Sequence, residues 1–226
     1  MLERRRFATS VALGCLWLAG CTQNTATGGQ QSTSSQQSTV DRATHTVATM
    51  KAGGGDKVAG LLQKAKAVMI FPDLVKGGVG LGASRGQGVL LGHTAAGWSD
   101  PAFYESTSVS VGLQIGLEES AVVMFVLSQK ALDTLLQTSS FTMKAGGGLS
   151  LADLNTATQD QLNGADVVIW SKSSGAFGGL TVSGSDIAQH TGEDQAYYGQ
   201  PVTARDIIAG KVTNPAAAAL VKALGA

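Results

Sequence analysis

Residues 77–92 read GGVGLGASRGQGVLLG, and this stretch decides what kind of fold the chain forms. From residue 78 onward its glycines occupy even positions, whereas apolar residues such as Val79 and Val89 occupy odd ones. A period of two is the signature of a β-strand, because alternate residues share a face. The stretch therefore predicts a strand that carries almost no side chains on one face.

The same alternation recurs in three later segments, at 108–117, 146–151 and 175–184. Glycine within a strand normally costs stability, since it loses backbone entropy on folding and offers no side chain for packing. Its repetition on one face predicts a compensating gain, which is either the close approach of another backbone layer or strong curling of the sheet.

Two site motifs compete with the strand for the same glycines. A phosphate-binding loop must lead into a helix N-terminus, whose free N–H groups hold the anion, but here the glycines lead into the apolar run Val89–Leu91. Gly82–Gly86 also matches the G-x-S-x-G nucleophile elbow, in which Ser84 would precede a helix. Because the pattern after Ser84 is that of a strand, a serine hydrolase is kept only as an alternative.

The remaining candidates for catalysis or metal binding are isolated. His45, His93 and His190 lie far apart in the sequence, and no free cysteine joins them, so neither a metal site nor a cofactor is predicted. The carboxylate pairs Glu118–Glu119 and Glu193–Asp194 are adjacent, so they would point to opposite faces of a strand or be solvated in a turn. We therefore predict that the protein is not an enzyme.

The N-terminus has the features of a bacterial lipoprotein signal peptide. Arg4–Arg6 are positive, Phe7–Leu18 are apolar, and Leu18–Cys21 reads LAGC, a lipobox. The apolar run is too short for a helix to span a bilayer of roughly 30 Å. We expect residues 1–20 to be cleaved and Cys21 to become the lipidated first residue. It would then be the sole cysteine of the mature chain, which leaves no internal disulfide.

Acylation would place the protein in the cell envelope. The two or three acyl chains of a bacterial lipoprotein tether it stably, since each buried CH₂ contributes roughly 0.8 kcal/mol. Thr22 stands where an aspartate would resemble the inner-membrane retention signal. This favours the outer membrane, with the domain facing the periplasm or the cell surface.

Residues 21–44 are expected to form a flexible tether, because Gln, Ser, Thr, Asn and Gly dominate its first part and offer too little apolar surface for folding. Residues 45–226 suit one domain. Removal of residues 1–20 takes away three arginines and one glutamate and leaves 13 basic and 15 acidic residues. Such a chain has no overall basic field, so no nucleic-acid partner is expected.

Local patterns predict helices at both ends of an antiparallel sheet. Apolar residues at three-and-four spacing predict an amphipathic helix over Asp56–Lys66, and the glycines of Gly53–Gly55 should stop it on its N-terminal side. Further elements are predicted as strands at 66–71, 121–127, 166–170 and 175–185 and as helices at 128–137, 203–210 and from Asn214 onward. The fold class is therefore α+β, with a strongly bent, glycine-rich sheet that is barrel-like or sandwich-like.

One segment of the chain is locally basic. Between residues 51 and 85, six basic residues stand against Asp56 and Asp73. Each basic residue near a membrane contributes roughly 1 kcal/mol of attraction to anionic headgroups, although ordinary solvated lysines explain the segment equally well. The candidate lipid-binding residues are Lys51, Lys57, Lys64, Lys66, Lys76 and Arg85.

Five ordered motifs give the chain a resemblance to the SYLF-domain family. They read AKAVMIFP at 65–72, GQGVLL at 86–91, WSDPAF at 98–103, GLQIG at 112–116 and SSGAFGG at 173–179. The likeness spans about Val58 to Gly210, which is nearly the whole folded part.

This resemblance implies a lipid-binding module. Eukaryotic members of the family are reported to bind phosphoinositides or phosphatidic acid through an N-terminal amphipathic helix and basic residues, and some associate with actin. The helix expected over Asp56–Lys66 matches that lipid-binding position. Actin is not an available partner in a bacterial envelope, so that part of the family description should not transfer.

Together these observations predict a non-enzymatic, lipid-anchored envelope protein with a SYLF-like domain. Its membrane contact would be acylated Cys21, its candidate ligand is an anionic phospholipid headgroup, and its protein partner is unknown. The alternative is an envelope structural or interaction module that holds another protein or peptidoglycan without lipid specificity.

Overall fold

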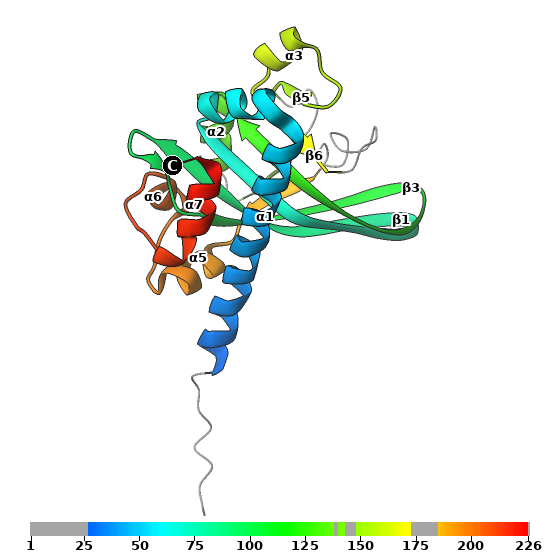
Figure 1. Ribbon diagram of the computed structural model, residues 1–226. Helices are drawn as coiled ribbons and strands as arrows, with labels where there is room; N and C mark the ends of the chain where they lie inside the picture. The colour runs from blue at the N-terminus through cyan, green and yellow to red at the C-terminus, as the bar shows by residue number, and fades with distance from the viewer. Residues whose placement is uncertain (1–26, 138–139, 143–147, 173–184, 226) are drawn as a thin grey trace, which may run out of the picture.

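The computed structural model describes residues 27–137, 140–142, 148–172 and 185–225 (Figure 1). The expected signal peptide, Cys21, the motif at 173–179 and nearly all of the strand expected at 175–185 lie outside the described residues. The described chain combines helices with a mixed sheet, so the predicted α+β class is confirmed.

Two long strands dominate the sheet. β1 (Ala67–Thr94) and β3 (Ala102–Val126) pair antiparallel along nearly their whole length. The strand order is β2-β1-β3-β6-β5, while β7 pairs with both β3 and β4. The β5–β6 pair is parallel, so the antiparallel arrangement expected from the sequence is wrong there. The shorter strands are β2 (Gly97–Trp98), β4 (Ser140–Thr142), β5 (Leu151–Asp153), β6 (Val167–Ser171) and β7 (Asp186–Gln189).

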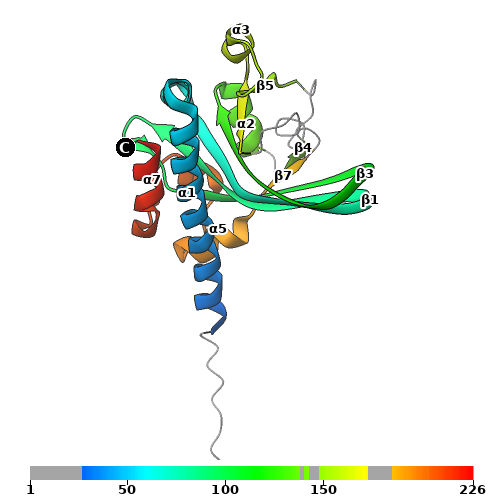
Figure 2. The same cartoon turned by 45° about the vertical axis from the view of Figure 1, so that its right-hand side comes forward.

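The β1–β3 ribbon is folded in half, as Figures 1 and 2 show from two directions. Its register shifts between Phe71 and Leu74 and again between Val79 and Leu81, and such irregularities bend a strand pair. The end of β1 returns to the start of the strand, because the N–H of His93 donates to the carbonyl oxygen of Lys66 at 2.8 Å. The sheet is therefore strongly bent, but it is not closed into a barrel.

Glycines make this fold-back possible. A Cβ added at Gly88 would lie 2.4 Å from Cδ1 of Phe71 and 2.6 Å from the carbonyl oxygen of Ile70. A Cβ added at Gly86 would lie 2.6 Å from the carbonyl oxygen of Asp73. All of these contacts join the second half of β1 to its first half. The predicted close approach of another backbone layer is thus confirmed at these two positions.

Helices cover both faces of the sheet. α1, α5 and α7 pack on one set of alternate strand residues, which includes Val68 and Val123. α2 and α6 pack on the intervening set, which includes Met69 and Met124. The central strands are therefore buried on both sides, which explains their unbroken apolar runs. The helices are α1 (Thr27–Lys64), α2 (Gln129–Gln137), α3 (Gln159–Asn163), α5 (Thr191–Tyr198), α6 (Ala204–Ile208), the 3-10 turn η1 (Pro215–Ala217) and α7 (Ala218–Leu224).

The long helix α1 corrects one expectation. It begins at Thr27, so the flexible tether expected over residues 21–44 is wrong from that residue onward. The physical reason is a buried stripe at alternating four-and-three spacing, which packs where α1 contacts α5 and α7. This stripe contains Gln36, Val40, Ala43, Val47 and Met50.

The capping residues predicted from the sequence mark the starts of three helices. Ser128 caps α2 by accepting the N–H of Ala131 at 3.1 Å, and Thr203 caps α6 by accepting the N–H of Asp206 at 3.2 Å. Asn214 caps η1 in the same way. Helix α5 was not predicted from the sequence, and its N-cap residue His190 makes no side-chain capping bond.

Gly88→Ala is expected to lower the free energy of unfolding by about 2 kcal/mol or more, because the added methyl group meets a backbone carbonyl and a buried ring. Gly192→Ala is the matched control, since a Cβ at that position meets nothing within 4 Å. Urea unfolding followed by circular dichroism measures both variants. Equal stability of the two would contradict the close approach.

Candidate functional site

The second segment of α1 forms one wall of a groove. Gly55 has φ 49° and ψ −139°, a left-handed conformation that favours glycine, so α1 consists of two helices that meet there. The helix break expected at Gly53–Gly55 is therefore confirmed at Gly55. The residues before this break are also helical, which the sequence did not predict. Beyond this break, residues 56–64 face α3 across a groove of about 550 Å³. We call it the α1–α3 groove.

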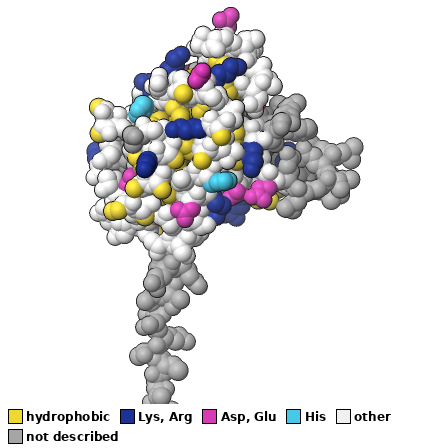
Figure 3. Space-filling model, in the orientation of Figure 1, with side chains coloured by type: hydrophobic (Ala, Val, Ile, Leu, Met, Phe, Trp, Pro, Cys, Tyr) yellow, Lys and Arg dark blue, Asp and Glu magenta, His cyan; other side chains and the backbone are white. Residues whose placement is uncertain are grey.

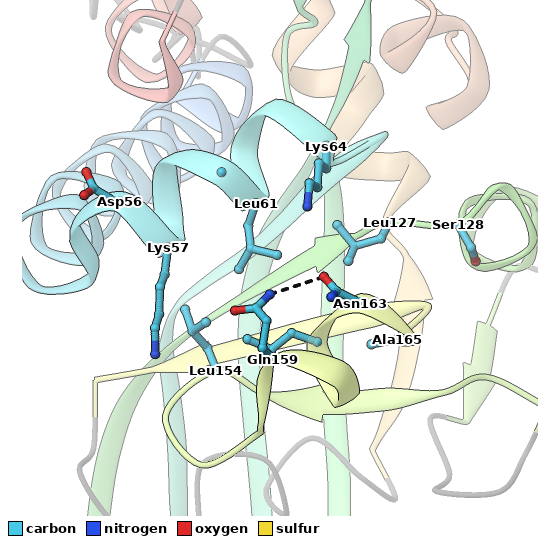
Figure 4. Close-up of a pocket in the computed structure, with 12 residues that line it drawn as sticks. Asp56, Lys57, Leu61, Lys64, Leu127, Ser128, Leu154, Gln159, Asn163 and Ala165 are labelled. Carbon is cyan, nitrogen blue, oxygen red and sulfur yellow. Dashed lines mark hydrogen bonds between the residues drawn. The ribbon is translucent and has the colours of Figure 1, made fainter.

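The α1–α3 groove has an apolar floor and a polar rim (Figure 4). The floor contains Leu61, Leu127, Leu154, Leu162 and Ala165. The rim contains Asp56, Lys57, Lys64, Ser128, Gln159 and Asn163. A groove of this volume falls in the range of small-molecule sites. Its lining suits a ligand that is partly apolar and partly charged.

Two lysines give this groove its charge. Lys57 and Lys64 are exposed and stand two helical turns apart, and Figure 4 shows both side chains extending from α1 toward the α3 side. Among the described residues, Asp56 is the one acidic residue that lines the groove, so this lining has a net positive charge that favours an anion. The apolar face expected of this segment is confirmed by the burial of Val58, Leu61, Leu62 and Ala65.

The other four candidate lipid-binding residues do not line the groove. Lys51 lines a separate cavity of about 280 Å³ beside α7, and Lys66 is exposed just before β1. Lys76 and Arg85 lie on the β1–β3 ribbon, where Nε of Arg85 is 2.5 Å from Oε1 of Glu105. Two of the six residues therefore share the groove, and the others are distributed over the domain.

The face formed by α1 and α7 has no broad basic patch. Figure 3 shows its basic side chains spread over the surface, with acidic side chains and apolar surface between them. Charges arranged in this way offset one another beyond about 10 Å at ordinary salt concentration. An anion would therefore be attracted at a local feature such as the α1–α3 groove.

Ser84 does not have the surroundings of a hydrolase nucleophile. It lies within β1, which continues as a strand to Thr94. Its Oγ lies 2.6 Å from Oγ of Ser108 on β3, and the residue is 5% exposed. A nucleophile elbow requires a helix directly after the serine. The G-x-S-x-G match is therefore part of a strand.

The described ranges hold neither a cluster of metal-ligating side chains nor a helix suited to crossing a membrane. No group of three or more His, Cys, Asp or Glu side chains in those ranges is placed to hold a metal ion. Among the helices described, none is both long enough and apolar enough to cross a membrane.

Asp194 on α5 overturns the expectation that Glu193 and Asp194 are simply solvated. Asp194 is 1% exposed, and its Oδ1 accepts the N–H of Phe103 at 2.7 Å. Burial raises the pKa of Asp194 to about 7, against the opposing effect of that hydrogen bond and with the charge of Glu193 adding to it. Glu193 accepts a hydrogen bond from Gln87 at 2.6 Å, and its own burial raises its pKa.

A comparison with family models assigns the chain to a family. The model described as "Ysc84: Las17-binding protein actin regulator" matches residues 107–226, more than half of the chain. The chain belongs to the Ysc84/SYLF domain family. The match covers most of β3 and every described element after it, including α3 of the groove, and it confirms the family expected from the five motifs.

Relatives of this Ysc84/SYLF chain include proteins of animals and fungi. "SH3 domain-containing YSC84-like protein 1" of Bos taurus is 28% identical over 173 residues, which is 73% of this chain and 50% of that protein. "LAS seventeen-binding protein 3" of Saccharomyces cerevisiae is 26% identical over 172 residues, which is 73% of this chain and 37% of that protein. The chain thus spans about half the length of these curated relatives or less. The name of the yeast relative describes a binding protein, and the description of the matching family model names an actin regulator.

Asp194→Asn is expected to remove a pH dependence of stability. The pKa of Asp194 is about 7 in the folded protein and about 4 in an unfolded chain. Between about pH 4 and pH 7 the carboxyl of Asp194 is protonated in the folded state and ionised in the unfolded state. The free energy of unfolding therefore falls as the pH rises through this range. The wild-type protein should lose on the order of 2 kcal/mol between about pH 5 and pH 8. The asparagine variant should lose much less, since it keeps the acceptor for Phe103 without the charge.

Thermal unfolding across this pH range provides the measurement. Asp160→Asn, at an exposed position on α3, is the control and should follow the wild-type profile. Parallel profiles for the wild-type protein and Asp194→Asn would show that the buried carboxyl does not titrate in this window.

Proposed function

We propose that the protein is a non-enzymatic, lipid-anchored protein of the bacterial cell envelope whose domain binds anionic phospholipid headgroups in the α1–α3 groove. The observation that carries this proposal is the pair Lys57 and Lys64 above an apolar floor, with Asp56 as the single acid among the lining residues that the structure describes. A lipid phosphate would meet the two ammonium groups. The apolar part of the glycerol backbone would contact leucines of the floor.

The proposed anchor rests on the N-terminal sequence. Positive residues, a short apolar run and the LAGC lipobox precede Cys21, and acyl chains on this cysteine would hold the protein at the outer membrane. Thr27, the first residue of α1, follows Cys21 by six residues. An extended chain of that length reaches at most about 20 Å. Acylation would therefore keep the start of α1 close to the membrane.

A second candidate function is binding of a protein. It is favoured by the names of the relatives, which include "LAS seventeen-binding protein 3", and by the description of the matching family model. For this chain the corresponding role would be an envelope interaction module that holds a protein, or peptidoglycan, through its sheet and helices. This role would be favoured if the domain retained a protein partner but bound no phospholipid vesicles.

Charge reversal of Lys57 and Lys64 to glutamate should weaken binding to anionic vesicles about thirtyfold or more. Each lysine near such a surface contributes roughly 1 kcal/mol, and the new carboxylates add repulsion. Flotation of the unacylated chain, residues 22–226, with vesicles containing phosphatidylglycerol measures the effect. Binding by the wild-type protein should also fall as the salt concentration rises.

Lys222→Glu is the matched control for this experiment. Lys222 is an exposed lysine on α7, outside the groove lining, so its reversal should change binding by less than about threefold. Equal losses in the control and the groove variant would indicate a diffuse charge effect. Unchanged binding by the groove variant would refute the site.

Cys21→Ala is expected to abolish acylation of the N-terminus and, with it, the proposed attachment to the outer membrane. Without the cysteine thiol no acyl chain can be added, and residues 22–26 are largely polar. Fractionation of cells, with mass spectrometry of the N-terminal peptide, measures the change. A wild-type peptide that begins at Met1 and carries no lipid would contradict the proposed anchor.

A further inference from the structure

The wall of the groove opposite the lysines is formed by α3 and is rigidly held. Thr158 and Gln161 form a reciprocal capping box at its start, and the N–H of Gly164 donates to the carbonyl oxygen of Asp160 at 3.0 Å at its end. Leu162 anchors the helix in the apolar core. A helix capped at its start and anchored by a buried residue presents its exposed side chains from a defined backbone.

Two amide side chains on α3 face the groove. Gln159 and Asn163 stand one helical turn apart, and Nε2 of Gln159 donates to Oδ1 of Asn163 at 3.2 Å (Figure 4). This bond leaves Oε1 of Gln159 as an acceptor and Nδ2 of Asn163 as a donor, and neither has a further hydrogen bond within the part of the chain that the structure describes. The wall thus offers an acceptor and a donor close together.

The groove therefore presents three kinds of chemistry to one ligand. Lys57 and Lys64 suit a phosphate, the leucine floor suits a hydrocarbon segment, and the amide pair suits a group that both donates and accepts hydrogen bonds. A hydroxyl group has that double character. A headgroup ammonium would be repelled by the lysines, and a bare phosphate ester would leave the amide pair without a polar partner.

We infer that the α1–α3 groove selects anionic phospholipids whose headgroup carries hydroxyl groups, such as a glycerol headgroup, and that Gln159 and Asn163 determine this specificity. The inference rests on the proposed function and adds to it a headgroup preference beyond charge. Lysines alone recognise any lipid of equal charge to the same extent, whereas the α3 amides distinguish headgroups by their hydroxyl groups.

Two vesicle compositions of equal charge separate these effects. Phosphatidylglycerol has a hydroxylated headgroup, and phosphatidylmethanol has the same single negative charge without a hydroxyl. The unacylated chain, residues 22–226, should bind vesicles with phosphatidylglycerol about fivefold more tightly than matched vesicles with phosphatidylmethanol, as expected for one net hydrogen bond. Flotation at a fixed salt concentration measures the ratio of the two affinities.

The double variant Gln159→Met and Asn163→Leu should bind both vesicles equally, at the wild-type level for phosphatidylmethanol. These side chains have nearly the size of the originals without their polar atoms, and both positions are exposed, so the fold should tolerate them. Gln195→Leu on α5, another exposed amide, is the control and should keep the wild-type ratio. Because the readout is a ratio, any general effect of added apolar surface on vesicle binding cancels.

The outcomes distinguish the inference from the proposed function. Equal wild-type affinity for the two vesicles, or an unchanged ratio in the double variant, would overturn the role of α3 while loss of binding in the Lys57 and Lys64 variant still supported the groove. Absence of wild-type binding to either vesicle would overturn both.

Discussion

The two halves of a single strand lie so close together in this fold that a side chain at Gly86 or Gly88 of β1 would collide with the opposite half. That contact lets the long β1–β3 ribbon bend double, so that His93 at its far end hydrogen-bonds Lys66 at its beginning. The same histidine also contacts the residue that directly follows α1, since its Nδ1 lies 3.0 Å from the carbonyl oxygen of Ala65. The hydrogen bonds of His93 therefore fix the end of α1, which forms the groove wall, against the folded ribbon.

Features whose signal lies within a short window of sequence could be predicted. Alternating glycines indicated a strand that another backbone layer approaches closely. The spacing of Val58 and Leu61 indicated the second segment of α1. Thr203 and Asn214 marked helix starts because each accepts a backbone N–H only two or three residues away. Such interactions form between neighbours in the chain, so spacing and residue type are enough to reveal them.

The groove and the buried carboxylate could not be found in this way, because their partners are distant in sequence. Asp194 is bonded to a residue 91 positions earlier, and Lys57 shares the groove with Gln159 of α3. The first segment of α1 was misjudged for another reason. Its buried stripe includes the polar residues Gln36 and Thr39, so its composition resembles that of a solvated linker although its spacing is that of a packed helix.

The helix α1 also joins the two ends of the chain. The side chain of Gln37 bonds with Tyr197 of α5 and with the backbone of Ala216 before α7, so α1 packs against elements that are synthesised much later. Because a ribosome makes α1 first, the buried face of residues 27–50 stays uncovered until α5 and α7 have been made. Polar residues on that face, such as Gln36, would reduce aggregation before folding is complete. Closure of the core is therefore a late event in folding, because α1 cannot complete its packing until α5 and α7 are present.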